Sequence, residues 1–168
     1  ITQFPNLTHM SVFEYVYMPE KVVMPIVRHY PQHLKYLTIE SYQMQNFFHF
    51  HSLPVNLLKL TLKGCNENMT LVTGQQWSRL ENLQELHLKL HTACVLRCCD
   101  LPSSRLRLSL CCKLHEGSVA GLPIGLLHLD LSEFLGDLRL QPGELPSSLL
   151  RLILSKSYTK PSLSQDVL

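Results

Sequence analysis

Cysteine and histidine side chains are the residues of this chain whose types and spacing could support metal chemistry. Pairs of Cys or His a few residues apart can bind zinc in a tetrahedral site. The candidate ligands are His91, Cys94, Cys98, Cys99, Cys111, Cys112 and His115. Adjacent cysteines in an extended segment point to opposite sides, so few of these thiols can converge on one ion. We therefore expect inert thiols and no cofactor, with a structural zinc or a disulfide as the alternative.

A serine, a histidine and an aspartate occupy the same outward position of three consecutive predicted strands, as Ser109, His87 and Asp130. Neighbouring strands lie about 4.8 Å apart, so the first and last of these positions are separated by about 10 Å. A catalytic triad requires hydrogen-bond contact at each step. The chain also lacks a P-loop, a nucleophile elbow and a dinucleotide-binding fingerprint. We expect ordinary surface polarity at these positions and a protein that is not an enzyme.

The elements that would position these side chains are repeats of one short pattern. Four segments share Leu-Pro, two variable residues and a run of alternating apolar and polar residues, namely 53–62, 101–110, 122–131 and 145–154. With the first position of an LxxLxL unit as the phase marker, units begin at Leu7, Leu34, Leu57, Leu83, Arg105, Leu126 and Leu149. Spacings of 21 to 27 residues predict one solenoid of about seven coils over residues 1–168. Each coil contributes a short strand whose fourth and sixth positions face the core.

Parallel strands cannot be joined by tight turns, so each coil must return along the opposite, convex side. Apolar residues at helical spacing predict a short helix within 20–30, and a second within 74–82 that places Trp77 and Leu80 inward. From Cys112 onward, Gly, Pro and Ser predict extended or turn-like returns. The predicted fold is an α/β-type solenoid with a parallel β-sheet on its concave face and short helices and extended or turn segments on its convex face.

The LxxLxL units and their spacing resemble the leucine-rich repeat superfamily over nearly the whole chain. Residues 122–168 are most similar to the FNIP type, whose units read LPxSLxxLxL and continue into a Phe-Asn-x-Pro turn. This chain departs from that turn, since it has Tyr158-Thr159-Lys160-Pro161 in the last unit and Phe134-Leu135-Gly136-Asp137 in the sixth. The Leu-Pro-rich repeats of bacterial effector ubiquitin ligases are also similar, although they carry an Asn two residues after the strand that is absent here.

The outward strand positions form three rows on the predicted concave face, which is an extended binding surface in stacked-coil solenoids. Five of these residues are Lys or Arg and three are acidic. The candidate binding residues are Tyr36, Lys59, Lys63, His87, Lys89, Arg107, His128 and Arg151. They predict a protein partner with acidic patches. RNA has less support, because aromatic residues do not interleave with the basic ones, and a solvated face without a partner is the simplest alternative.

Composition limits the other functions that the chain could have. Its 168 residues are 45% apolar, and its net charge of +2 is too small to indicate nucleic acid or an anionic membrane by itself. No apolar run approaches the roughly 20 residues that cross a bilayer, so we expect no membrane contact. The six cysteines include two adjacent pairs, which favours reduced thiols and an intracellular, cytoplasmic location. The sequons at Asn6 and Asn68 favour the secreted alternative.

Together these patterns predict a non-catalytic interaction or assembly module, a structural or scaffolding subunit of a larger complex. The end coils of a solenoid expose their core unless something covers them. We therefore expect a longer chain, with further repeats or a neighbouring subunit capping both ends. Two alternatives are the substrate-recognition arm of a ubiquitin ligase, of F-box or bacterial-effector type, and an extracellular recognition domain.

Overall fold

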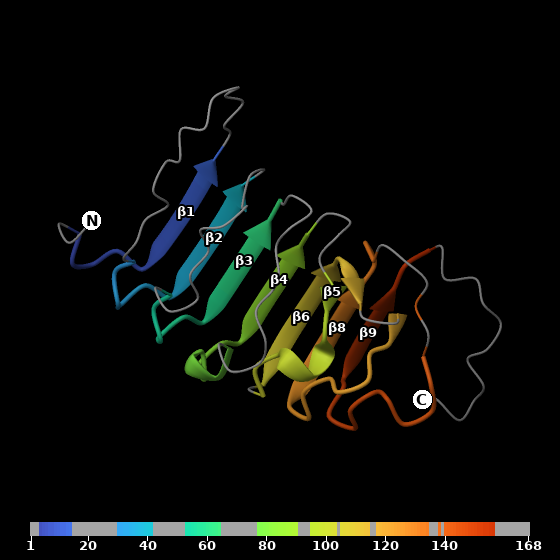
Figure 1. Ribbon diagram of the computed structural model, residues 1–168. Helices are drawn as coiled ribbons and strands as arrows, with labels where there is room; N and C mark the ends of the chain where they lie inside the picture. The colour runs from blue at the N-terminus through green and yellow to red at the C-terminus, as the bar shows by residue number, and fades with distance from the viewer. Residues whose placement is uncertain are drawn as a thin grey trace.

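The chain folds into a solenoid built on one parallel β-sheet, as the computed structural model shows (Figure 1). The structure describes residues 4–14, 30–41, 53–64, 77–90, 95–103, 105–114, 117–134, 138 and 140–156. The sheet has seven strands in the order β1-β2-β3-β4-β6-β8-β9. These are β1 (His9–Glu14), β2 (Tyr36–Ser41), β3 (Lys59–Lys63), β4 (Glu85–Lys89), β6 (Leu106–Cys111), β8 (Leu126–Leu131) and β9 (Arg151–Leu154). The prediction of stacked coils with parallel strands is confirmed.

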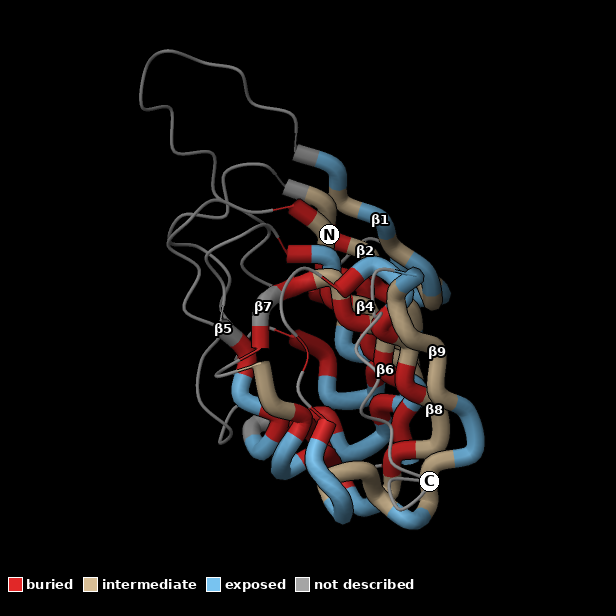
Figure 2. The backbone as a smooth tube through the Cα atoms, turned by 90° about the vertical axis from the view of Figure 1, so that its right-hand side faces the viewer, coloured by how far each residue is buried: buried red, intermediate tan, exposed pale blue. Residues whose placement is uncertain are grey.

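The core consists of the inward side chains of these strands, stacked coil upon coil. The fourth-position row is Met10, Leu37, Leu60, Leu86, Leu108, Leu129 and Leu152, and the sixth-position row is Val12, Ile39, Leu62, Leu88, Leu110, Leu131 and Leu154. In β2, β3, β4, β6 and β8 these side chains are at most 2% exposed, whereas those of β1 and β9 are partly buried. In Figure 2 the strands and the described return segments both carry buried residues, coloured red. Each buried leucine contributes about 1.5–3 kcal/mol.

A proline, which follows a leucine in all but one case, forms the turn by which the chain enters β2, β3, β8 and β9. The N–H of the first-position leucine donates to the carbonyl three residues earlier, from Leu34 to Pro31, from Leu57 to Pro54 and from Leu149 to Pro146. Leu126 and Pro123 form the same bond. Proline fits here because it has no N–H to leave unpaired and its fixed φ stiffens the turn.

The residue just before that leucine joins each turn to the preceding coil. His33 Nε2 lies 3.2 Å from the Phe4 carbonyl, and Asn56 Nδ2 donates to the Gln32 carbonyl at 3.3 Å. In the last described coil, Ser148 Oγ contacts the carbonyls of both Ile124 and Leu126. These bonds link successive turns at the corner of the solenoid, which is the turn just before each strand begins. They are called corner bonds below.

The fifth coil departs from the predicted phase. Arg105 was expected at the first core position, but it is exposed, and Leu106 is fully buried in its place. The register shifts at Leu106 and Arg107, so that Leu106 pairs with Leu126 while Arg107 pairs with His128. Between these two pairs β8 has one more residue, Leu127, than β6, as in a β-bulge. A leucine therefore still fills the core although the sequence places an arginine in phase.

The return side of the solenoid differs from the prediction, because no α-helix occurs there among the described residues. Of the predicted helix within 74–82 the structure shows one 3-10 turn, η2 (Trp77–Arg79), although Trp77 and Leu80 are buried as expected. A second 3-10 turn, η3 (Cys98–Asp100), lies beside a two-stranded parallel sheet of β5 (Val95–Leu96) and β7 (Lys113–Leu114). The helix predicted within 20–30 falls outside the described residues. None of the described helical turns has the length and apolar character needed to span a membrane.

Helical spacing failed as a predictor here because an isolated helix shorter than about 12 residues is marginal. The described return segments instead form 3-10 turns or short extended segments that pair with the next coil. The pairing of Val95 with Lys113 and of Leu96 with Leu114 is one instance.

The corner bonds predict a difference between two adjacent serines. Ser148→Ala removes a hydroxyl that contacts two backbone carbonyls of the preceding coil, so we expect a loss of about 1–2 kcal/mol in the free energy of unfolding. Ser147→Ala, at an exposed neighbouring position, is the control and should change it by less than about 0.5 kcal/mol. Urea unfolding measures both, and equal effects would show that the corner bond is unimportant.

Candidate functional site: the exposed face of the sheet

The candidate site is the side of the main sheet that points away from the leucine core, here called the exposed face. Its first row follows the strand pairing through His9, Tyr36, Lys59, Glu85, Arg107, His128 and Arg151. The second row is Ser11, Thr38, Thr61, His87, Ser109, Asp130 and Ile153. The third begins with Phe13, Glu40, Lys63, Lys89 and Cys111. The structure thus brings the predicted binding residues onto one surface.

Glu85 is the centre of a charge cluster on the first row. Lys59 Nζ lies 2.8 Å from Glu85 Oε2, and Arg107 Nη1 lies 3.5 Å from Glu85 Oε1. The hydrogen bond from Lys59 holds the pKa of Glu85 below its usual value, and burial opposes this effect. Two cations from the flanking strands therefore share one carboxylate.

Two lysines on the third row form ion pairs with glutamates. Lys63 Nζ lies 3.8 Å from Glu40, and Lys89 Nζ lies 2.7 Å from Glu133 Oε2. The hydrogen bond between Lys89 and Glu133 raises the pKa of the lysine and lowers that of the glutamate. Glu133 lies beyond the end of β8 and was not among the predicted face residues. It reaches Lys89 across β6, whose third-row residue is the small Cys111.

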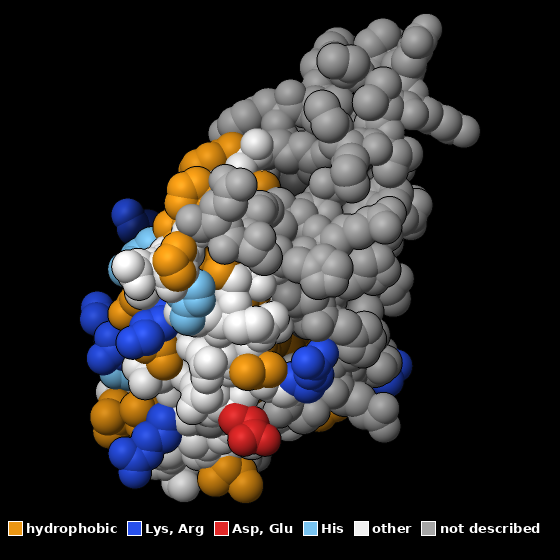
Figure 3. Space-filling model, turned by 90° about the vertical axis from the view of Figure 1, so that its left-hand side faces the viewer, with side chains coloured by type: hydrophobic (Ala, Val, Ile, Leu, Met, Phe, Trp, Pro, Cys, Tyr) orange, Lys and Arg blue, Asp and Glu red, His pale blue; other side chains and the backbone are white. Residues whose placement is uncertain are grey.

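These pairs change the electrostatic character expected from the sequence. All four central cations, Lys59, Lys63, Lys89 and Arg107, have a carboxylate within ion-pair distance on the same face. The side chain of Arg151 forms no ion pair or hydrogen bond within the described part of the chain. The centre of the face is therefore nearly balanced in charge, and its unpaired positive charge lies toward β9. Seen from the β1 end, Lys, Arg and His side chains gather along one margin of the molecule (Figure 3).

The exposed face is hollowed over its central strands. A hollow of about 440 Å³ is lined by residues that include Thr38, Thr61 and Lys89, and a second of about 290 Å³ by Arg107, His128, Arg151 and others. His87, Ser109 and Asp130 line both hollows. Small hydroxyl side chains on the second row leave this depression between the longer side chains of the first and third rows.

Aromatic side chains mark the β1 end of the face. The rings of His9 and Tyr36 stack with their centroids 4.1 Å apart and their planes at 11°. Thr8 Oγ1 lies 2.8 Å from His9 Nδ1 and fixes the imidazole. Phe13, on the third row of the same strand, is 57% exposed. The two ends of the face therefore differ, with aromatic surface at β1 and cationic surface toward β9.

His87 lies at the centre of the exposed face, and its surroundings disfavour the protonated form. Its Nε2 is buried, has no hydrogen-bond partner among the described residues and lies 3.7 Å from Glu85 Oε2, which is beyond hydrogen-bond distance. Burial lowers the pKa of His87, and the charge of Lys59 acts in the same direction, while Glu85 and Asp130 oppose it.

The order of side chains on the second row does not fit a catalytic triad. His87 pairs with Ser109, and Ser109 pairs with Asp130, so the serine lies between the other two. A triad requires the histidine in the middle. The Asp130 carboxylate instead accepts a hydrogen bond of 2.9 Å from the backbone N–H of Ser132.

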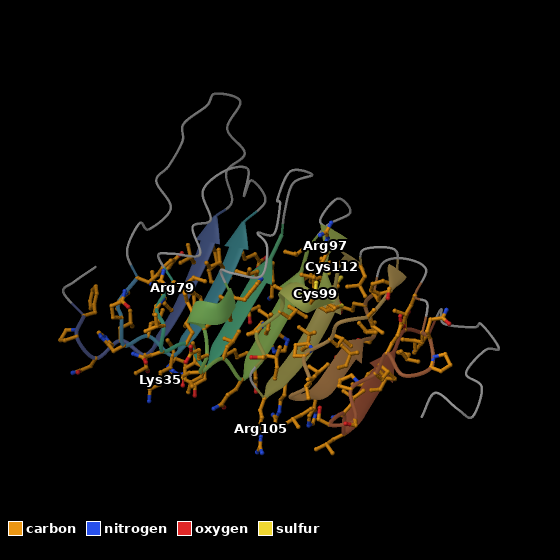
Figure 4. All side chains as sticks on the ribbon, turned by 60° about the horizontal axis from the view of Figure 1, so that its bottom comes forward. Lys35, Arg79, Arg97, Cys99, Arg105 and Cys112 are labelled. Carbon is orange, nitrogen blue, oxygen red and sulfur yellow. The ribbon has the colours of Figure 1, made fainter. Side chains whose placement is uncertain are left out.

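The described cysteines separate onto different sides of the solenoid. Cys98 and Cys112 are buried in the core, Cys99 is exposed, and Cys111 lies on the exposed face. None of the four forms a disulfide with another described residue, and the described residues contain no group of three His, Cys, Asp or Glu side chains able to hold a metal ion. Cys99 and Cys112 are labelled in Figure 4, the first exposed and the second buried. The other candidate zinc ligands, His91, Cys94 and His115, fall outside the described residues.

Comparison with models of protein families, with curated proteins and with solved structures found no match for this chain.

The lowered pKa of His87 predicts that the free energy of unfolding depends on pH. As the pH falls below 6.5, the imidazole of the unfolded chain takes up a proton before that of the folded chain, so the wild type loses stability through this window. His87→Gln removes the linkage and should flatten this loss. Urea unfolding on both sides of pH 6.5 compares the two proteins, and an NMR titration locates the midpoint of His87. A midpoint at or above 6.5 would contradict the prediction.

Thiol alkylation should distinguish the adjacent cysteines of η3. Burial raises the pKa of Cys98 to about 12, and its Sγ donates to the Ser118 carbonyl at 3.8 Å. We expect iodoacetamide to modify exposed Cys99 in the native protein and to spare Cys98 and Cys112 until urea is added. Peptide mass spectrometry identifies the alkylated cysteines, with Cys99→Ala as the control. Labelling of Cys98 in the native protein would show that η3 is not packed as described.

Proposed function

We propose that this chain is a non-catalytic protein-binding and assembly module of the leucine-rich repeat type, with the exposed face as its binding surface. The observation that carries this proposal is a seven-strand face lined by polar and charged side chains, with two hollows and no described element over it. A solenoid whose coils contact only their neighbours offers such a surface for an elongated partner.

The charge pairs support a protein partner over a nucleic acid. A polyphosphate would compete with Glu40, Glu85 and Glu133 for the lysines that they already bind. Nucleic-acid binding depends on cations that are available to neutralise phosphates. A protein with both signs of charge can match the balanced centre of the face, and an acidic patch on it fits the end near Arg151.

Further contacts at the ends of the solenoid belong to the same proposal. Met10 and Val12 on β1, and Leu152 and Leu154 on β9, are only partly buried among the described residues. Partly buried apolar side chains at both ends support a neighbouring subunit or further repeats stacked there, in a scaffolding role within a larger complex. The four described cysteines form no disulfide with one another, which supports an intracellular location.

A bulky substitution on the second row tests the proposed function. Ser109→Arg places a long cation in both hollows at once and should abolish cross-links between the exposed face and its partner. Gln141→Arg introduces the same side chain at an exposed position of the connection before β9 and should leave them intact. Cross-linking mass spectrometry on the tagged full-length protein reads the sites.

Thermal unfolding checks that both variants are folded. Cross-links that map to the exposed face in Ser109→Arg as in the wild type would overturn the proposal. Their absence from that face in the wild type would overturn it as well.

A further inference from the structure

The last three strands carry an acid-poor cationic row. Arg107 pairs with His128 and His128 pairs with Arg151, so the three side chains occupy successive strands of the first row. Strands about 4.8 Å apart place the two arginines about 10 Å from each other at the backbone. Arg107 shares Glu85 with Lys59 over a contact of 3.5 Å, and Arg151 forms no ion pair within the described ranges.

Two exposed apolar residues lie on the turns that lead into β8 and β9. Ile124 and Leu150 are 85% and 77% exposed, the largest values among the exposed large hydrophobic residues in the described part of the chain. Leu150 directly precedes Arg151, and Ser148 Oγ contacts the carbonyl of Ile124, so the two residues lie on adjacent corners. Their burial by a partner would contribute about 1.5–3 kcal/mol each.

We propose that this cationic and apolar corner, formed by Arg107, Ile124, His128, Leu150 and Arg151, binds an extended segment of a partner protein in which acidic and bulky apolar residues alternate. The inference rests on the proposed function and names the chemistry of the partner. In an extended strand, alternate side chains point to opposite sides. Carboxylates on one side then meet Arg107 and Arg151, while apolar side chains on the other cover Leu150 and Ile124.

The carboxylates near the row favour a peptide over a membrane surface. Glu85 and Asp130 line the same hollow of about 290 Å³ as the two arginines. A continuous anionic surface would be brought against both carboxylates, and like charges placed together are unfavourable. Carboxylates spaced by apolar residues can meet the arginines and avoid the acids.

Fluorescence anisotropy with labelled model peptides tests the inference on the full chain. The probe is a fluorescein-labelled peptide of alternating Glu and Leu. We expect it to bind, and we expect the alternating Glu-Ser and Lys-Leu peptides to bind at least about tenfold more weakly, because each lacks one half of the recognised chemistry. Vesicles of phosphatidylserine and phosphatidylcholine are the membrane probe and should not bind.

Substitutions within the corner locate the binding site. Arg151→Glu and Leu150→Ser should each weaken binding of the Glu-Leu peptide by about tenfold or more, since each removes one anchor at an exposed position. Arg97→Glu is the matched control, because Arg97 is exposed and directly follows β5 on the return side. Figure 4 shows Arg97 away from Arg105, which precedes the corner residue Arg107 by two positions. Equal binding of the Glu-Ser peptide, no effect of the two variants, or binding to vesicles alone would overturn the inference.

The same variants separate this inference from the proposed function. If Ser109→Arg removes the partner cross-links while Arg151→Glu and Leu150→Ser keep them, the exposed face binds its partner elsewhere and only the inference fails. If none of the three changes the cross-links, both proposals fail. Unfolding midpoints close to that of the wild type show that each variant is folded.

Discussion

The fold depends on the stacking of leucines from one coil upon the leucines of the next. No single coil can bury its own strand, because a short strand and its return segment enclose too little volume. Burial is achieved only when Leu60 lies against Leu37 on one side and Leu86 on the other. The hydrogen-bond ladder of the sheet fixes that spacing, and the corner bonds of His33, Asn56 and Ser148 fix it again at the turn. Everything on the exposed face takes its position from this register.

The register was readable in the sequence because strand alternation has a period of two and recurs in every coil. That regularity sufficed to place His9 beside Tyr36 and Lys59 beside Glu85, as the pairing shows. It did not reveal the register shift between β6 and β8. Arg105 is in phase but charged, whereas Leu106 is apolar but one residue out of phase, and only the need for a buried leucine decides between them. The α-helix predicted within 74–82 was wrong, because so few residues at helical spacing form only the 3-10 turn of Trp77–Arg79.

The exposed face shows what a list of outward residues omits. From the sequence, Lys63, Lys89 and Arg107 looked like a surface with spare positive charge, but strand pairing joins Lys63 to Glu40, and the turn after β8 brings Glu133 to Lys89. Glu133 could not be placed because its position depends on a turn rather than on the alternation of a strand. Charge that is satisfied within the face gives specificity rather than strong attraction, since a partner must offer matched groups to replace or extend each pair. The end near β9 remains the part with charge to spare.

The register shift between β6 and β8 coincides with a change in backbone hydrogen bonding at the fifth coil. At the earlier junctions one carbonyl accepts two N–H groups from the next coil, as Thr8 does from Lys35 and Tyr36. At the junction with the fifth coil Gln84 accepts from Arg107, while Leu106 donates forward to Gly125. In a linear array whose stability is a sum over nearest-neighbour couplings, a junction with a different bond pattern is where cooperativity divides. By this reasoning the coils before the fifth and the coils after it would unfold separately when the protein is destabilised, with the break at this junction.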